Sequence, residues 1–341
     1  MEIVLFIRNL RDEFANKVSP TRHSVAYKIW ARWIITHRSL FTQTGFFLPS
    51  DNLETDTQIL VEMVDQQLTL AEAKEIYNWL MDQSKQIKPV DDINEISIET
   101  SAGRILLSDT NKLLTHTIHS TIYNKLSAKY RENQDQIQNQ IQNCQTAIWL
   151  CHTLYELLEG KGLQWAVPRP VMYALTEHFN CRTELFASAI NHIYPDYYSL
   201  FPVERLFGSR GNFFDEDSTA FQEGAFQVNP PFIDPILTEL TDRLLNFLSE
   251  SDKHGRSLTF ILIMPDWTDS QSYENLIASQ YCTKLIELKR DTHVYYEYES
   301  DSQIVARFGT FIFIMSTVPS ICTYAAERDI RNGFRFKDSR L

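Results

Sequence analysis

The second half of the chain alternates short apolar segments with stretches of helix length. Strand-like runs lie at Ala225–Val228, Leu258–Met264, Lys284–Leu288, His293–Tyr298 and Arg307–Met315. Strands separated by helix-length segments indicate an α/β sheet with crossover connections. Such sheets bind ligands beyond the carboxyl ends of their strands. The alternation therefore predicts both the fold class and the edge of the sheet at which a functional site is expected.

The first 160 residues show a helical periodicity instead. Apolar side chains recur at spacings of three and four residues, for example at Val25, Ile29 and Trp33, as on one face of a helix. Residues 133–145 are rich in Gln and Asn, but an apolar stripe continues through them. This stripe predicts an amphipathic helix that runs through the amide-rich segment and ends at Gly160.

Length and composition are those of a globular protein with two domains. The chain has 341 residues, 43% of them hydrophobic and 22% charged, which suits one large or two ordinary domains. We expect an all-helical domain over residues 1–164, with a loop at Lys88–Thr100, and an α/β domain over residues 165–341. The longest apolar runs, Phe260–Met264 and Phe311–Met315, are too short to cross a bilayer, so no membrane partner is expected.

Cysteines and histidines form no metal-binding pattern. The five cysteines are scattered without a Cys-x-x-Cys pair, which argues against zinc and disulfide frameworks and favours a reducing, intracellular setting. His116 and His119 could share a helix face, but a third ligand is missing from the pattern. Met1–Leu10 has neither the basic lead-in nor the cleavage site of a signal peptide. The sequence therefore predicts an intracellular protein without a metal.

The segment Asn229-Pro230-Pro231-Phe232 is the strongest candidate for a functional site. It follows directly on the strand predicted at Ala225–Val228. Asp234 and Pro235 then supply a helix N-cap and a proline for the first helical position. Because both prolines of the segment fix φ, we expect a stiff strand-to-helix turn. The alternative is a proline-rich turn with no further role, since such turns are common.

A rigid carboxamide at this turn suits chemistry on an adenine amine. The lone pair of that amine is delocalised into the purine ring, so the amine is a poor nucleophile. The Asn229 side-chain oxygen and the Pro230 carbonyl can accept its N–H bonds and help to localise the lone pair. Phe232 can stack on the base, as in enzymes that act on extruded bases. With S-adenosylmethionine as an already activated methyl donor, the remaining catalysis is positioning and electrostatics.

The net charge of the chain limits the kind of nucleic acid that it can bind. Formal net charge is −12 at pH 7. Proteins that follow a long phosphate backbone usually present a basic face, because phosphate neutralisation supplies most of that affinity. The acidic balance therefore favours a small or compact nucleic acid over long duplex DNA.

Five segments, in a fixed order, carry a resemblance to one family. They are Glu184-Leu185-Phe186-Ala187-Ser188, Phe207-Gly208-Ser209-Arg210-Gly211, Asn229-Pro230-Pro231-Phe232, Pro265-Asp266-Trp267, and Glu297-Tyr298 followed by Ser302-Gln303. In this order the chain resembles the phosphorylated C-terminal-domain-interacting factor family, the cap-specific adenosine-N6 methyltransferases of messenger RNA. The resemblance implies a Rossmann-like class I methyltransferase core and an N-terminal helical domain. It further implies methylation of the adenosine beside a 7-methylguanosine cap and a nuclear location, where the cytoplasm would otherwise be expected.

The resemblance also implies roles for single positions. Those that grip the amine are Asn229, Pro230, Pro231 and Phe232. Those expected to bind the methyl donor are Glu184, Phe186, Ala187, Ser188 and Gly208, with Glu184 a candidate for the ribose hydroxyls. Those on the cap-binding side are Asp234, Pro265, Asp266 and Trp267, since an aromatic face and carboxylates suit a cationic methylated guanine. Purely structural roles stay open for Phe186 as strand core, Asp234 as helix N-cap and Trp267 as a buried strand end.

Two departures from the family limit what is implied. No pair of tryptophans has the spacing of a WW module, so we expect no WW domain. The segment between Gln303 and the strand predicted at Arg307–Met315 is short, which leaves cap dependence open. Two other functions stay open: a DNA adenine-N6 methyltransferase with the same chemistry, and a non-catalytic RNA-binding scaffold that kept the fold.

Overall fold

The chain folds into two compact units in the computed structural model. The structure describes residues 2–42, 44–47, 56–87, 95–109, 111–133, 141, 143–158, 164–298 and 302–335. The first unit is Met1–Lys161 with Phe201–Phe207, and the second is Gly162–Leu200 with Gly208–Leu341. The domain predicted over residues 165–341 thus includes seven residues, Phe201–Phe207, that pack with the first unit.

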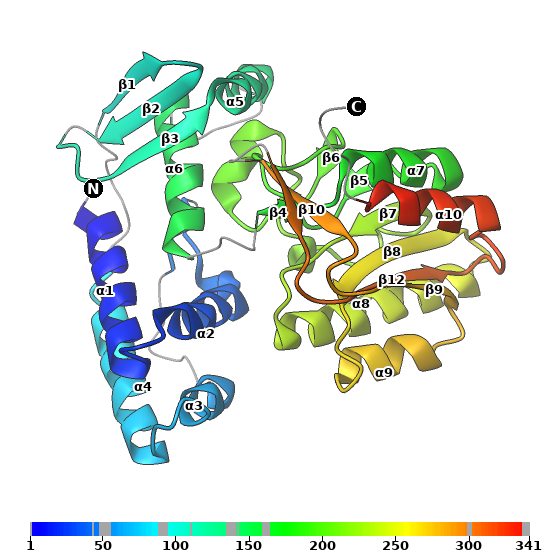
Figure 1. Ribbon diagram of the computed structural model, residues 1–341, viewed down its shortest axis with the longest axis horizontal. Helices are drawn as coiled ribbons and strands as arrows, with labels where there is room; N and C mark the ends of the chain where they lie inside the picture. Colours follow the sequence, from blue (N-terminus) through cyan, green and yellow to red (C-terminus); the bar gives the residue numbers. More distant parts are fainter. Residues whose placement is uncertain are drawn as a thin grey trace. The chain divides into compact units, whose positions relative to one another are not determined.

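The first unit combines helices with a small sheet (Figure 1). Its helices are α1 (Glu2–Val18), α2 (His23–Thr36), α3 (Thr57–Val64), α4 (Leu70–Ser84), α5 (Ser120–Asn133) and α6 (Cys144–Leu157), with 3-10 turns η1 (Arg38–Leu40) and η3 (Pro202–Phe207). Its strands are β1 (Ile96–Ser101), β2 (Arg104–Asp109) and β3 (Thr115–His119). Helix α6 forms much of the core, since Trp149 and Cys151 on it are fully buried.

The prediction that this unit is all-helical is wrong, because β1, β2 and β3 form an antiparallel sheet. Strand β1 also occupies the end of the loop predicted at Lys88–Thr100, of which residues 88–94 lie outside the described part. Ala102 and Gly103 join β1 to β2 with φ of 47° and 77°. Two positive φ angles in a two-residue connection are typical of a type I′ hairpin. Gly103 was the only turn-forming residue at this connection to signal the hairpin in the sequence.

The amide-rich segment does not continue one helix either. Helix α5 ends at Asn133 and α6 begins at Cys144, while residues 134–140 and 142 lie outside the described part. The side-chain oxygen of Asn143 accepts hydrogen bonds from the backbone N–H groups of Gln145 (2.8 Å) and Thr146 (3.3 Å). Asn is a good N-cap because it satisfies such unpaired helix donors. The cap therefore starts a new helix inside the apolar stripe.

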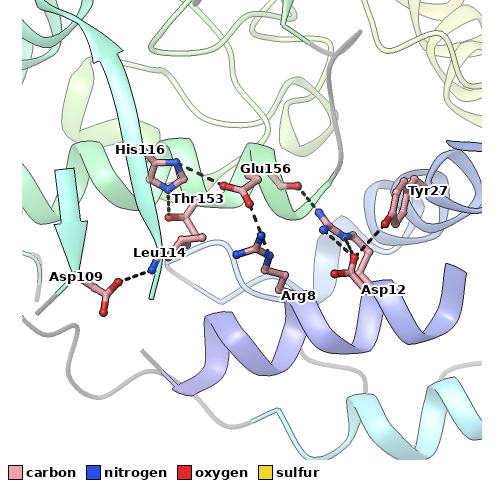
Figure 2. A network of polar contacts seen from close by, with 9 residues as sticks. Arg8, Asp12, Tyr27, Asp109, Leu114, His116, Thr153 and Glu156 are labelled. Carbon is pink, nitrogen blue, oxygen red and sulfur yellow. Dashed lines mark hydrogen bonds and ion pairs between the residues drawn. The ribbon is translucent and has the colours of Figure 1, made fainter. Parts of the chain in front are cut away.

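A polar network joins α1, β3 and α6 in this unit (Figure 2). His116 on β3 lies 2.8 Å from the Thr153 hydroxyl through Nε2 and 3.5 Å from the Glu156 carboxylate through Nδ1. Burial, helped by His152 and Arg8, lowers the pKa of His116 to about 3, so the ring is neutral at pH 7.

The expectation that His116 and His119 share a helix face is wrong, since both lie on strand β3. Residues three apart on a strand point to opposite faces of its sheet. Across the described ranges, no group of three or more His, Cys, Asp and Glu side chains could hold a metal ion. None of the described helices is long and apolar enough to span a bilayer.

The second unit is built on a six-stranded mixed sheet. Its strands are β5 (Thr183–Glu184), β6 (Asp196–Tyr197), β7 (Gly224–Val228), β8 (Leu258–Pro265), β9 (Cys282–Leu288) and β12 (Thr310–Ser316), in the order β6-β5-β7-β8-β12-β9. Strands β6, β5, β7 and β8 pair in parallel, and β12 runs antiparallel to both β8 and β9. The α/β class predicted from the alternating pattern is confirmed.

A second, antiparallel sheet flanks the site described below. It has the order β11-β10-β4, with β4 (Trp165–Ala166), β10 (Val294–Glu297) and β11 (Ser302–Val305). The strand-like run predicted at His293–Tyr298 therefore belongs to this small sheet and not to the large one.

Helices cover both faces of the large sheet (Figure 1). They are α7 (Arg169–Phe179), α8 (Asp234–Lys253), α9 (Gln271–Ala278) and α10 (Tyr324–Gly333). Alternate strand residues such as Ile261 and Ile312 share a core with α7 and α10. Residues in between face the other way: Phe313 lies 6.0 Å, ring centre to ring centre, from Tyr273 on α9. Every residue of β8 and β12 is buried, so neither strand has a face exposed to solvent.

Candidate active site

Three of the predicted segments meet at the carboxyl edge of the large sheet. Glu184 on β5 pairs with Gln227 on β7, and Val228 pairs with Leu262 on β8. The strand order reverses at β5, because the chain continues from β5 to β6 on one side and then returns to β7 on the other. Open α/β sheets bind ligands in the crevice formed at such a reversal. The segments that follow β5, β7 and β8 all lie at this edge.

The Asn229-Pro230-Pro231-Phe232 segment forms the expected turn between β7 and α8. The Ile233 N–H donates to the Pro231 carbonyl at 2.8 Å, which closes the turn. The prediction that Asp234 is the N-cap is wrong by one residue: Ile233 occupies the cap position with no side-chain cap bond, and Asp234 is the first helical residue. The Asp234 carboxylate is exposed at the helix start, where the helix dipole favours a negative charge.

The Asn229 side chain presents a hydrogen-bond acceptor from this turn. Its Nδ2 donates to the Trp165 carbonyl at 3.3 Å, which fixes the orientation of the amide. Its Oδ1 is buried, and no donor among the described residues reaches it. An unpaired buried acceptor costs roughly 1–3 kcal/mol. A ligand N–H that reached this oxygen would remove that cost.

The Phe232 ring is held by an aromatic cluster that sequence analysis did not find. It meets Phe308 edge to face, with ring centres 5.7 Å apart at 87°, and Tyr295 at 6.4 Å and 76°. Trp165 lies parallel to Phe308, at 6.5 Å and 9°. Edge-to-face contacts are a favourable aromatic geometry. The cluster therefore fixes Phe232, and Trp165 serves both this cluster and the Asn229 amide.

Strand β5 ends at Glu184, so Phe186, Ala187 and Ser188 lie on the loop beyond it, and the alternative that Phe186 is strand core is wrong. The Glu184 side chain is only 5% exposed. Its Oε1 accepts from the backbone N–H groups of Ile193 (2.6 Å) and Tyr194 (2.7 Å). Glu184 therefore holds this loop against the strand, a role for which its sequence position gave no signal.

The loop after β5 is closely tied to its surroundings. The Phe186 ring is half-buried, 5.3 Å from Phe213 and 5.6 Å from Phe214. The Ser188 hydroxyl donates to Gln164 Oε1 at 2.8 Å and accepts from the Asn191 N–H at 3.1 Å. The loop is thus a structured rim of the crevice.

Gly208 lies in a second loop, beside β6. Gly208 and Gly211 have φ of 93° and 114°, in the region that favours glycine. The Arg210 N–H donates to the Tyr197 carbonyl at 2.9 Å, and its guanidinium pairs with Asp196 at 2.8 Å. This loop is therefore anchored on β6, across β5 from Asn229.

Pro265, Asp266 and Trp267 lie where β8 ends. Pro265 is the last, buried residue of the strand, and Asp266 is exposed. A Cβ atom on Gly309 would lie 2.2 Å from Asp266 Oδ2, so any other residue at position 309 would displace this carboxylate. Trp267 is half-buried, so the alternative that it is simply a buried strand end is wrong.

The fifth predicted segment belongs to the small sheet. Glu297 on β10 pairs with Trp165 on β4 in the strand register, and the Trp165 indole N–H donates to its carboxylate at 3.4 Å. Gln303 on β11 pairs with Tyr296. Glu297 thus contacts Trp165, the residue whose carbonyl orients Asn229.

The fold and this edge define an α/β protein with a buried amide acceptor at a strand-order reversal. The chain belongs to the phosphorylated CTD interacting factor 1 family: the family model described as "Phosphorylated CTD interacting factor 1 WW domain" matches residues 125–298, a little over half of the chain. The match includes the residues after β5, β7 and β8, and the resemblance inferred from the five segments is confirmed.

Two curated relatives are similar over part of the chain. Both are named mRNA (2'-O-methyladenosine-N(6)-)-methyltransferase. The one from Homo sapiens is 31% identical over 154 residues, which are 44% of this chain and 21% of the relative. The one from Mus musculus is 30% identical over 154 residues, 44% of this chain and 20% of the relative. The matched part thus spans about a fifth of the relatives' length.

Proposed function

We propose that this protein is an S-adenosylmethionine-dependent adenosine-N6 methyltransferase that acts on RNA, at the first adenosine beside a 7-methylguanosine cap. The buried Oδ1 of Asn229 carries the proposal, because no donor in the described part of the chain reaches it and the Nδ2 bond to Trp165 fixes its orientation. The names of the two relatives support the reaction.

The sheet supports a Rossmann-like class I methyltransferase core. Four parallel strands reverse their order at β5, and an antiparallel strand, β12, is inserted between β8 and β9. This arrangement is typical of such methyltransferases. We propose that the first unit is the accessory domain that the family resemblance implies, with a sheet added to its helices.

The methyl donor would be held by the two loops beside β5. S-adenosylmethionine, when bound, supplies a methyl group on a positively charged sulfur. Phe186, Ala187 and Ser188 follow β5, and Gly208 lies beside β6, so these residues flank the reversal at which such sheets bind ligands. Glu184 contributes by fixing the first of these loops.

Asn229 and Phe232 would act on the target amine. Asn229 Oδ1 accepts one amine N–H and the Pro230 carbonyl the other, which leaves the nitrogen lone pair more localised. The half-buried Phe232 ring stacks on the base. Because the prolines and the Trp165 contact hold the turn in place, little reorganisation is needed, which is the source of electrostatic catalysis.

A capped RNA end suits the other side chains of this edge. The exposed carboxylates of Asp234 and Asp266 and the half-buried ring of Trp267 are groups that a cationic methylated guanine attracts. Pro265 is the last residue of β8, the strand that precedes Asp266 and Trp267. The net charge of −12 further favours a short, compact target over duplex DNA.

Donor binding and substrate choice test the proposal separately. S-adenosylhomocysteine at about a hundred times its Kd should stabilise the fold by about 2.7 kcal/mol and raise the Tm. Transfer of labelled methyl should be faster to capped, adenosine-initiated RNA than to uncapped RNA or duplex DNA. No rise in Tm would support the scaffold alternative, and faster transfer to DNA would support a DNA methyltransferase.

A further inference from the structure

The two-residue segment Gln164–Trp165 contacts both strand ends of the site. The Gln164 side chain accepts from the Ser188 hydroxyl at 2.8 Å, and its backbone carbonyl accepts from Asn191 Nδ2 at 3.4 Å, on the loop after β5. The carbonyl of the next residue, Trp165, accepts from Asn229 Nδ2 beyond β7. Gln164 thus lies between the proposed donor loop and the proposed amine acceptor.

The Gln164 side-chain oxygen accepts a hydrogen bond within the protein, whereas its side-chain nitrogen has no acceptor among the described residues. Ser188 Oγ already accepts from Asn191, so its own hydrogen needs an acceptor, and this sets Gln164 Oε1 toward Ser188. Gln164 Nε2 then points away from this contact. It is buried, with the residue 5% exposed, and finds no acceptor among the described residues.

The site therefore holds a buried donor, Gln164 Nε2, and a buried acceptor, Asn229 Oδ1, that have no partner among the described residues and lie on adjoining parts of one hydrogen-bonded segment. Adenine offers the complementary pair, an amine donor with a ring-nitrogen acceptor on either side, N1 or N7. Guanine offers an oxygen in place of the amine. That oxygen would face Asn229 Oδ1, acceptor against acceptor.

We propose that Gln164 Nε2 donates to a ring nitrogen that flanks the target amine, so that Gln164 and Asn229 together select adenine. This inference rests on the proposed methyltransferase function. The same donor chemistry would fit the adenine of S-adenosylmethionine. The target adenine is favoured because Gln164 is bonded in sequence to Trp165, the residue that orients Asn229.

The variant Gln164→Glu isolates the proposed contact. It keeps the acceptor for Ser188, replaces the donor with an oxygen and adds a negative charge, which Gln164→Met does not. We expect kcat/KM for adenosine-initiated RNA to fall about ten- to a hundredfold, as for an unpaired buried group. The Kd for S-adenosylhomocysteine should stay unchanged. Circular dichroism and Tm give the folding control, and Gln164→Met, which lacks both amide atoms, replaces Gln164→Glu if the latter does not fold.

Base analogues show whether the lost contact is to the ring. RNA that begins with 1-deazaadenosine or 7-deazaadenosine lacks one flanking nitrogen. In wild-type protein, one of these analogues should lower kcat/KM relative to adenosine. The same analogue should lower kcat/KM of the Gln164 variant about ten- to a hundredfold less, because the variant has already lost the contact. If, for each analogue, kcat/KM falls by the same factor in wild-type protein and in the Gln164 variant, the inference is wrong.

Two results separate the inference from the function beneath it. A weaker Kd for S-adenosylhomocysteine with unchanged KM for RNA would assign Gln164 to the donor's adenine and overturn the proposal. If wild-type protein neither binds S-adenosylhomocysteine nor transfers methyl to RNA, the proposed function itself is wrong and the inference with it.

Discussion

Replacing Asn229 with alanine should separate catalysis from folding. The change removes an unpaired buried oxygen and one 3.3 Å hydrogen bond from Nδ2 to the Trp165 carbonyl. The lost bond costs about 1 kcal/mol, and loss of the unpaired oxygen offsets part of this. We expect little change in the free energy of unfolding.

The effect on methyl transfer should be far larger. A preorganised contact to the reacting group is typically worth about a hundred- to a thousandfold in rate, or roughly 3–4 kcal/mol. Single-turnover transfer of labelled methyl to capped, adenosine-initiated RNA measures this step directly. Calorimetry with S-adenosylhomocysteine should show that the donor still binds.

A matched control is the same Asn-to-Ala substitution at a position outside the proposed site. Asn275 on α9 uses its Oδ1 to accept from the Gln271 amide at 2.9 Å, and no proposed contact to donor or base involves it. Asn275→Ala should transfer methyl at the wild-type rate. Near-wild-type turnover in a folded Asn229→Ala protein would refute the assigned role of the carboxamide.

Three further predictions concern other parts of the structure. Phe232→Ala should raise KM for RNA roughly five- to a hundredfold, since base stacking is worth about 1–3 kcal/mol; an unchanged KM in a steady-state assay would contradict stacking. Glu184→Ala should lower the free energy of unfolding by about 3 kcal/mol or more in urea, because its carboxylate accepts two backbone N–H bonds; unchanged stability with weaker donor binding would instead favour a direct contact. Since the pKa of His116 is about 3 in the folded protein and about 6.5 when unfolded, its contribution to stability should be complete above pH 6.5 and decline as the pH falls toward 3. The unfolding free energy of His116→Gln should therefore depend less on pH over this range than that of wild type, and parallel curves would contradict the burial of a neutral ring.

The parts of the site that sequence predicted are those fixed by neighbouring residues. The turn after β7 follows from a short strand, two prolines and a helix start, which are all local signals. The helix start itself was misplaced by one residue, because Pro235 fits the second helical position as well as the first. The prolines thus predicted the position of the turn but not the residue that caps the helix.

The parts that sequence did not predict depend on distant pairing. Trp165 and Phe308 stack although most of the second unit separates them in sequence. The Glu184 carboxylate bonds to backbone groups nine and ten residues later, for which no residue pattern exists. The sheet of the first unit was missed because a short hairpin lay between strongly helical stretches. For Trp165 and for Glu184, tertiary contacts, which leave no periodic signature, decided the outcome.

The excursion of Phe201–Phe207 into the first unit has a consequence for how this protein can be divided. Phe201 stacks on Phe41 with ring centres 5.4 Å apart, and Glu204 accepts from the Tyr155 hydroxyl at 3.0 Å. Phe201, Glu204 and Phe207 are each at most 2% exposed. A fragment that starts at residue 162 would carry these side chains without their partners, and the remaining fragment would lose part of its own core. Recombination or proteolysis near residue 162 would therefore destabilise both fragments. We expect the two units to be inherited together and not exchanged separately between proteins.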